Sequence, residues 1–261
     1  MSTTASKAKG LIWLIAVIGL AAAFSLGLPF VASFTPWSVE RGLARWLGNP
    51  VAGSSCDRNA AGSSALQAVV GRLYPIYPGD SRFPLSIQII SGPTVNAFAH
   101  LGGKIYVYEG LLKLAESPEE LAGVLAHELE HVRRRHIIQG VVVRLFTVEG
   151  LRMVFEGLGG MDPTGSDTAS QLLNLGFSRE QEASADHGGL QRLKDGQIDV
   201  DGFGRFFERA ETSPLLPTFL SDHPANSQRA EWVKAVRGGP TRPLLTSAQW
   251  QALQGICRPS R

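Results

Sequence analysis

The sequence has few cysteines and little charge of either sign. Two cysteines among 261 residues are too few for a disulfide-rich scaffold or a cysteine-built zinc finger. Charged residues make up 18% of the chain, with 25 basic side chains against 23 acidic ones, and no long basic run occurs. This balance argues against nucleic acid as a partner. A hydrophobic content of 44% excludes an intrinsically disordered chain.

A long uncharged stretch near the N-terminus predicts a membrane anchor. No charged residue occurs from Gly10 to Val39, and the apolar residues 11–31 would span about 30 Å as a helix, the thickness of a bilayer core. Lys7 and Lys9 precede it, as expected for a cytoplasmic flank. The alternative is a cleaved signal peptide, whose apolar region is usually only about 7 to 15 residues long.

The two cysteines give evidence about which side of the membrane the domain occupies. Cys56 lies in a polar loop soon after the anchor, and Cys257 lies near the C-terminus. A bridge between them would pin the tail to the start of the domain and would indicate an oxidising compartment. Two unrelated thiols are the alternative. The charge rule is weak here, because Arg41 and Arg45 follow the apolar segment.

Residue patterns predict a small antiparallel sheet and several helices. Strands are expected at residues 85–90, 94–99 and 104–108, with a turn at 100–103. Helices are expected at 64–73, from 117 to well past 136, from 178, and at 200–211, 225–236 and 248–253. In the long one, Ser117 is the expected N-cap, Pro118 the first residue and Glu120 the partner in a capping box. The glycine-rich residues 157–167 predict a mobile surface loop.

The sharpest signal is an HExxH sequence inside the helix that begins near residue 118. His127 and His131 are four residues apart, so both imidazoles can reach one metal ion from the same helix face. Glu128 stands one step round the helix, where its carboxylate can accept a proton from water held by the metal. The alternative is a pair of ordinary surface histidines.

A catalytic zinc site needs a third protein ligand, and the best candidate is Glu182. The metzincin position for a third histidine is occupied by Ile137, and His136 is one place short of it. Glu182 and Asp186 share a helix face, so the first can bind metal while the second orients a ligand histidine. Glu180 competes as the ligand, but it has no carboxylate four residues later.

Glu130 places an unusual charge inside the motif. By helical geometry it projects away from the Glu128 side and can pair with Arg134, four residues later. The basic cluster of residues 133–135 is expected to be a solvated helix face.

Four ordered motifs make the chain resemble the membrane-anchored zinc metallopeptidases of peptidase family M48, the group of the HtpX, BepA, Oma-type and CAAX prenyl proteases. The resemblance covers residues 62–236 and is to the branch with a single anchor. The motifs are Asn96–Ala99 with Gly102 and Gly103, His127–His131 with His136, Glu182–Asp186, and His223–Pro224 followed by Arg229. It implies an α+β fold: a mostly helical zincin (gluzincin-like) domain with a small antiparallel sheet, preceded by one transmembrane helix.

The resemblance also implies roles for individual residues. One zinc ion (Zn2+) per chain would be bound by His127, His131 and Glu182, with Glu128 as general base and later proton donor. The edge strand that binds an extended polypeptide substrate would be formed by Asn96, Ala97, Phe98 and Ala99. The alternative for this segment is an ordinary hairpin of the core.

Three further residues complete the implied site. His223 matches the downstream histidine that stabilises the tetrahedral oxyanion. It could alternatively close the resting site as a fourth zinc ligand, or simply precede a helix that starts at Pro224. Asp186 matches the residue that orients a ligand histidine, and Arg229 matches an arginine near His223.

The sequence as a whole predicts a membrane-anchored zinc-dependent metalloendopeptidase, and the resemblance implies that its substrates are unfolded or misassembled envelope or membrane proteins. The alternative is a chaperone-like binding protein that uses zinc structurally and captures chains on its edge strand. We expect a single pass through the inner (cytoplasmic) membrane, with the catalytic domain in the periplasm. The expected parts are a cytoplasmic tail (1–9), the transmembrane anchor (10–34), an amphipathic stretch and linker (35–61), the metallopeptidase domain (62–236) and a C-terminal tail (237–261).

Overall fold

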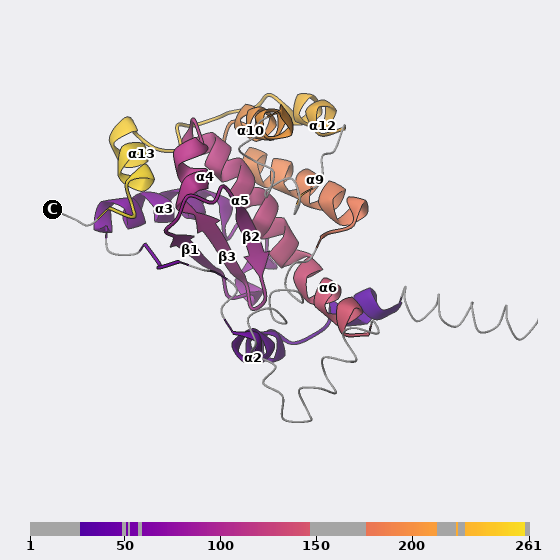
Figure 1. Ribbon diagram of the computed structural model, residues 1–261. Helices are drawn as coiled ribbons and strands as arrows, with labels where there is room; N and C mark the ends of the chain where they lie inside the picture. Colours follow the sequence, from indigo (N-terminus) through magenta and orange to yellow (C-terminus); the bar gives the residue numbers. More distant parts are fainter. Residues whose placement is uncertain are drawn as a thin grey trace, which may run out of the picture.

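The computed structural model describes residues 27–48, 51, 53–56, 59–146, 176–212, 223 and 228–258 (Figure 1). The predicted tail at 1–9, most of the predicted anchor and the predicted loop at 157–167 lie outside these residues. Residues 27–32 are helical. Among the helices that are described, none combines the length and the hydrophobicity that a bilayer crossing requires.

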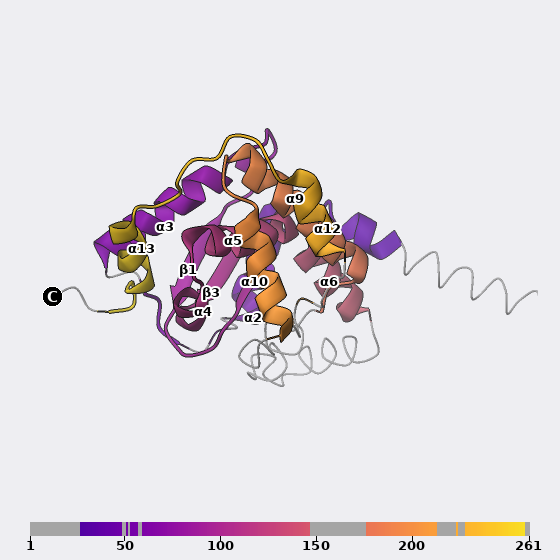
Figure 2. The ribbon, with the colours of Figure 1, turned by 90° about the horizontal axis from the view of Figure 1, so that it is seen from above.

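Along the chain, the three strands come one after another, with helices before and after them (Figures 1 and 2). In chain order they are α2 (Trp37–Leu47), α3 (Ala60–Leu73), the 3-10 turn η1 (Asp80–Arg82), β1 (Ser86–Ile90), β2 (Ala97–His100), β3 (Lys104–Tyr108), α4 (Glu109–Leu114), α5 (Pro118–Arg133), α6 (His136–Leu145), α9 (Arg179–Asp195), α10 (Asp201–Thr212), α12 (Arg229–Val236) and α13 (Ser247–Gln254). For the described residues, the α+β class with mostly helical structure and a small sheet is therefore confirmed.

The sheet is mixed, so the prediction of an antiparallel sheet was wrong in part. Its strand order is β1-β3-β2: β3 runs antiparallel to β2 but parallel to β1. Gly102 and Gly103 close the β2–β3 turn with φ of 78° and 79°, and a Cβ on Gly103 would lie 1.9 Å from the Pro84 carbonyl oxygen. Strand alternation specifies which side chains share a face and carries no information on direction, so the parallel β1–β3 pair left no sequence signal.

Helix α5 is the centre of the domain. Every residue from Glu120 to Val132 is buried, because α5 packs against α9, α10, α3 and β2 (Figure 2). Ser117 caps it through a hydrogen bond accepted from the Glu120 N–H, and Pro118 is its first residue, as predicted. A capping box would also need the Glu120 carboxylate to accept from the Ser117 N–H. It accepts instead from the Glu116 N–H at 3.0 Å, so this second hydrogen bond of the predicted capping box was wrong.

Two small residues bring α9 close to α5. A Cβ on Gly189 would lie 3.1 Å from the His127 backbone nitrogen, and one on Gly188 would lie 2.2 Å from a Glu130 carboxylate oxygen. Larger side chains at these positions would push the two helices apart. The close approach is what places acidic residues of α9 beside the histidines of α5.

The prediction of one helix running past residue 136 was wrong, because α5 ends at Arg133 and α6 begins at His136. Arg135 between them has a left-handed backbone, with φ of 66° and ψ of 23°. Its guanidinium pairs with Glu40 at 2.7 Å and stacks 3.6 Å from the centre of the Trp37 ring, so contacts with α2 hold the break. These contacts also leave Arg135 only 8% exposed, so the residue-133–135 cluster is not simply a solvated face.

Cys56 and Cys257 form a disulfide, which confirms the bridge that the sequence left open. The bridge ties the segment before β1 to the end of α13, across 201 residues of chain. Closing so long a loop restricts the unfolded chain, so we expect the double variant Cys56→Ser/Cys257→Ser to lose about 2–4 kcal/mol of unfolding free energy in urea. Reductant should weaken the wild type to the same level and leave the variant unchanged; a wild type insensitive to reductant would contradict this.

Candidate active site

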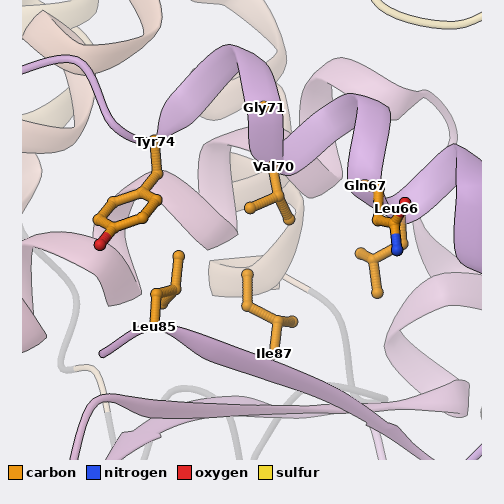
Figure 3. Close-up of a pocket in the computed structure, with 7 residues that line it drawn as sticks. All are labelled: Leu66, Gln67, Val70, Gly71, Tyr74, Leu85 and Ile87. Carbon is orange, nitrogen blue, oxygen red and sulfur yellow. The ribbon is translucent and has the colours of Figure 1, made fainter. Parts of the chain in front are cut away.

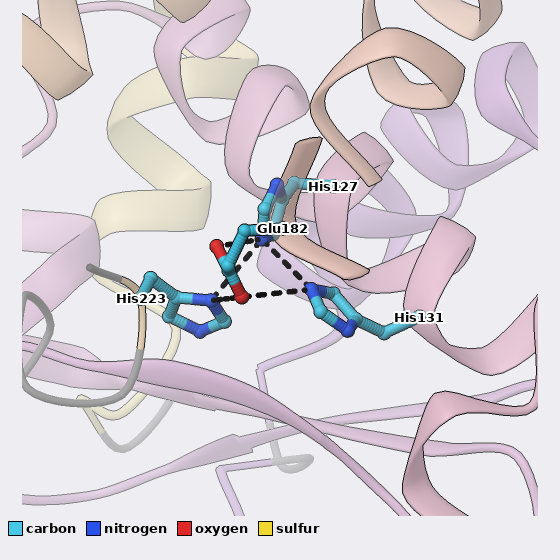
Figure 4. Close-up of side chains that lie close together, drawn as sticks. All are labelled: His127, His131, Glu182 and His223. Atoms are coloured by element: carbon cyan, nitrogen blue, oxygen red, sulfur yellow. Dashed lines mark hydrogen bonds and ion pairs between the residues drawn. The ribbon is translucent and has the colours of Figure 1, made fainter. Parts of the chain in front are cut away.

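Four buried side chains converge at the middle of α5. His127 and His131 come from α5, Glu182 from the first turn of α9, and His223 from the chain after α10 (Figure 4). The Nε2 atoms of His127 and His131 are 3.0 Å apart, and His223 Nδ1 lies 3.1 Å from His127 Nε2. One ligand atom from each of the four residues lies within 4.8 Å of the others.

Glu182, and not Glu180, is the carboxylate that joins this cluster. Its Oε1 lies 3.4 Å from His131 Nε2 and 3.3 Å from His223 Nδ1, and its Oε2 lies 3.5 Å from His127 Nε2. Glu180 is exposed, and its carboxylate accepts a hydrogen bond from the Ser178 hydroxyl at the helix start. Ser178 also caps α9, which fixes the first turn that carries Glu182.

The cluster fits a metal cation. Bonds of about 2.0–2.1 Å in a tetrahedral site separate neighbouring ligand atoms by about 3.3 Å, close to the separations of 3.0–3.5 Å found here. Glu182 Oε2 is fully buried and accepts no hydrogen bond from the described residues. Buried lone pairs of imidazole and carboxylate that face one another need a proton or a cation between them, and this donor set suits a borderline divalent metal such as zinc.

Asp186 and Arg229 form a chain behind His127. Asp186 Oδ1 lies 3.0 Å from His127 Nδ1, and Asp186 Oδ2 accepts a hydrogen bond from Arg229 Nε at 2.9 Å. The Arg229 guanidinium in turn stacks 3.8 Å from the centre of the Phe207 ring. When His127 Nδ1–H donates to Asp186, the lone pair of His127 Nε2 is directed into the cluster.

His136 supports His131 in a way that the sequence did not indicate. The Nδ1 atoms of the two rings are 3.1 Å apart, on the side of His131 away from the cluster. Burial lowers the pKa of His136 to about 2, with a further contribution from His131, so His136 is neutral. Phe177 packs against His131 with its ring tilted by 36°, at 3.9 Å between ring centres. The break after α5 brings His136 here, and helical spacing alone would have turned it elsewhere.

Glu128 lies between the edge strand and His223. Its Oε2 accepts a hydrogen bond from the Ala99 N–H at 2.7 Å, and its Oε1 lies 3.1 Å from His223 Nε2. Burial raises the pKa of Glu128, but His223, with smaller effects of His127 and His131, brings it below its ordinary value. For His223, burial lowers the pKa, and Glu128 and Glu182 together raise it well above its ordinary value.

The four residues expected to bind substrate lie on or next to β2, the strand at the edge of the sheet nearest α5. Ala97 and Ala99 are buried, and the Asn96 side chain accepts a hydrogen bond from the Ala97 N–H at 2.9 Å. Phe98 contacts Tyr106 and Tyr108 on the neighbouring strand. Of the four, Ala99 makes the direct contact with the candidate catalytic residues, through its hydrogen bond to Glu128.

Glu130 is the centre of a buried ion network on the other side of α5. It accepts hydrogen bonds from Arg133 and Arg134, which confirms the predicted pairing with Arg134. It also accepts from Arg192 of α9 at 2.9 Å, and Arg192 donates to Asp80 at 2.7 Å. Glu130, Asp80 and Arg192 are all completely buried. No local pattern in the sequence connects Asp80 or Arg192 to the HExxH motif.

His100, the last residue of β2, is buried, and we expect its titration to lower the stability of the domain in acid. Burial lowers its pKa to about 4, and the nearby Lys104 contributes, although the contact with the Leu101 carbonyl acts in the opposite direction. Since the unfolded pKa is about 6.5, the unfolded chain binds the proton more tightly, and stability present above pH 6.5 is lost as the pH falls toward 4.

This His100 contribution amounts to about 2 kcal/mol of unfolding free energy between pH 7 and pH 5. His100→Asn keeps an amide that can donate to the Leu101 carbonyl and removes the titration. Urea unfolding should therefore show a smaller loss in this variant than in the wild type over that pH range. Parallel losses in both proteins would contradict the assignment.

A separate pocket of about 350 Å³ opens between α3 and β1 (Figure 3). Its lining is mostly apolar and contains none of the cluster residues: Leu66, Gln67, Val70, Gly71, Tyr74, Leu85 and Ile87. The Tyr74 hydroxyl lies 2.8 Å from the backbone carbonyl oxygens of residues 80 and 83 and shares its hydrogen between them, so it is engaged in holding the turn before β1. This pocket therefore has no evident part in the chemistry of the cluster.

An HExxH helix whose histidines meet a carboxylate from a later helix defines the class of HExxH metallopeptidases. The chain belongs to peptidase family M48, whose family model matches residues 64–237. The resemblance drawn from the four motifs is thus confirmed.

Several curated proteins are similar to this chain. Mitochondrial metalloendopeptidase OMA1 of Schizosaccharomyces pombe is 32% identical over 167 residues, which are 59% of this chain and 48% of that protein. Metalloprotease LoiP of Escherichia coli is 32% identical over 160 residues, 58% of this chain and 62% of the relative. The beta-barrel assembly-enhancing protease of Escherichia coli is 26% identical over 180 residues, 63% and 37% respectively. The chain thus spans less than two thirds of the length of each relative.

Proposed function

We propose that the protein is a membrane-anchored zinc-dependent metalloendopeptidase, with His127, His131 and Glu182 as the zinc ligands. The observation that carries this proposal is the convergence of the two HExxH imidazoles and the Glu182 carboxylate within 3.5 Å of one another. Membership of peptidase family M48 supports it. We assign the peptidase domain to residues 62–236 and the anchor to residues 10–34.

Zinc held by these residues would polarise the scissile carbonyl and acidify water. Glu128 is the proton carrier: it accepts a proton as water attacks the carbonyl carbon and then passes it to the leaving amine nitrogen. The Ala99 N–H fixes one of its oxygens, which leaves the other to face the reacting atoms once His223 has moved from it. Asp186 and Arg229 keep His127 in the tautomer that a ligand requires.

His223 has two roles in this proposal. In the arrangement described above, its Nδ1 completes a four-residue cluster and its Nε2 faces Glu128, so the site is closed to substrate. When it withdraws to admit a peptide, its ring N–H can stabilise the oxyanion that develops on the carbonyl oxygen. The same side chain would thus close the resting site and assist the reaction.

An extended polypeptide is the substrate that the site supports. A peptide strand could lie along β2, at the edge of the sheet beside Glu128, and be held mainly through its backbone. We infer unfolded or misassembled envelope or membrane proteins as the natural substrates and protein quality control as the role, in keeping with a relative named beta-barrel assembly-enhancing protease. We place the domain in the periplasm, anchored to the inner membrane, which the disulfide favours.

Metal removal and return test this function on the full chain in detergent. The zinc-loaded protein should cleave a chemically unfolded protein internally, with fragments identified by mass spectrometry. A chelator should abolish cleavage, and one equivalent of zinc should restore it. Persistent cleavage in the metal-free protein would contradict a metallopeptidase.

A chaperone-like, non-catalytic binding protein is the second candidate, and the four-residue cluster favours it. Structural zinc sites are closed by a fourth protein ligand, and His223 occupies such a position. The two functions separate in His223→Ala, which opens the site. A binding protein would capture unfolded chains without cutting them in either form, whereas a closed protease would cleave with the wild type or with the opened variant.

Removing the Asp186 carboxylate should weaken metal binding. In Asp186→Asn, the hydrogen bond from His127 Nδ1 becomes weaker and the pairing with Arg229 is lost, so we expect zinc affinity to fall about 10–100-fold. Competition with a chromogenic chelator measures this. Glu180→Gln on the same helix is the matched control and should bind zinc as the wild type does; equal affinity of Asp186→Asn would remove the assigned role.

A further inference from the structure

The exposed hydrophobic side chains of the described part gather on three neighbouring segments. These are residues 27–34, helix α2 and the C-terminal end of α6; in Figure 1, α6 lies at the right and α2 at the bottom, both away from α13. The large apolar residues with exposures of 39–68% are Phe30, Val31, Phe34, Val39, Trp46, Val143 and Phe146. Elsewhere in the described ranges no large hydrophobic side chain is as exposed.

The outer face of α2 combines apolar and basic side chains. Helical geometry places Val39 and Trp46 on one flank of this face and Arg41 and Arg45 on the other, and all four are exposed. A helix with this division is suited to lie in the interface of a bilayer that contains anionic lipids.

The inner face of α2 fixes it rigidly to the domain. Its buried residues include Glu40, which accepts a hydrogen bond from the Gly102 N–H at 2.8 Å and pairs with Arg135 at 2.7 Å. Gly102 lies in the turn after β2, and Arg135 lies just after the HExxH helix. A surface that binds α2 therefore also sets the orientation of strand β2 and of the four-residue cluster relative to that surface.

We propose that α2 and the end of α6 continue from residues 27–34, the end of the anchor, as a membrane-docking face, and that α2 and the end of α6 lie in the headgroup region of an anionic bilayer. The uncharged sequence from Gly10 leads directly into this face, so the chain arrives at the bilayer where the exposed apolar residues are. A second copy of the chain is a poorer occupant, because a two-fold contact through α2 would bring the exposed Arg41 and Arg45 of both copies into one interface. This inference rests on the proposed membrane attachment and goes beyond it, since an anchor alone leaves the domain free to turn.

Spin labels on the full-length chain test this face. The chain is reconstituted in vesicles of phosphatidylcholine and phosphatidylglycerol, with a nitroxide at Val39→Cys or Val143→Cys and a control at Gln251→Cys on α13. The first two labels should have an oxygen-to-nickel-chelate accessibility ratio several-fold above the control, as expected for immersion in the interface. Omitting phosphatidylglycerol, or introducing Arg41→Gln with Arg45→Gln, should lower that ratio.

The other outcomes separate the docking face from the anchor. Chains that float with the vesicles while both labels read as aqueous would overturn the docking face and leave the anchor standing. Spin–spin broadening between labels at residue 143 would identify a second copy as the occupant and also overturn it. Chains that do not float would overturn the membrane attachment and the docking face together. The cleavage assay in detergent is independent of all these results, so it tests the peptidase activity separately.

Discussion

Glu128→Gln should retain zinc and lose about 10³-fold or more in kcat, because a buried general base is removed while the ligand cluster is kept. The Glu128 carboxylate is not among the atoms of the cluster, and glutamine has nearly the same shape. Its amide oxygen can still accept from the Ala99 N–H. Catalysis and metal binding should therefore separate cleanly in this variant.

The measurement pairs cleavage rates on an unfolded protein with zinc content per chain. Glu116→Gln is the matched control: this residue is 68% exposed at the side chain and precedes α5, so both quantities should stay at wild-type values. Equal turnover by Glu128→Gln would remove the assigned base. Loss of zinc together with activity would show that the carboxylate holds the site together.

Arg192→Met should lower the unfolding free energy by about 3–5 kcal/mol, because it leaves buried carboxylates without their partner. Arg192 is completely buried and donates both to Asp80 and to Glu130. Arg133 and Arg134 still contact Glu130, so most of the cost falls on Asp80. The pKa of Asp80 reflects this: burial raises it, and the bond with Arg192 and two backbone N–H groups lower it below its ordinary value.

Urea unfolding measures the Arg192 effect, with Lys194→Met as the control on the exposed face of the same helix. The control should change stability little. Adding Asp80→Asn to Arg192→Met should recover part of the loss, since it removes the charge left unpaired. A change within about 0.5 kcal/mol in Arg192→Met would show that the network contributes nothing.

The parts of the site that the sequence predicted are those with a local geometric rule. Helix periodicity brings His127 and His131 together, and the i, i+4 spacing of Glu182 and Asp186 distinguishes the first from Glu180. The structure places each of these as that spacing suggested. Their roles in binding zinc remain predictions that the experiments above test.

The features that the sequence missed depend on contacts between distant segments. Arg192 reaches Glu130 because Gly188 and Gly189 let α9 approach α5, and no residue pattern reports that approach. The break at Arg135 is held by Glu40, about a hundred residues earlier, while the apolar periodicity continues through it. The parallel pairing of β1 with β3 was not predicted, because the alternation of buried and exposed side chains is the same in parallel and antiparallel strands.

Zinc K-edge X-ray absorption on the metal-loaded full chain measures directly whether the HExxH helix holds the metal. We expect one zinc per chain, bound only by nitrogen and oxygen at about 2.0–2.1 Å, with imidazole scattering that diminishes in His131→Ala. Sulfur in the coordination sphere, or a spectrum that His131→Ala leaves unchanged, would contradict the assignment of the metal to the HExxH helix.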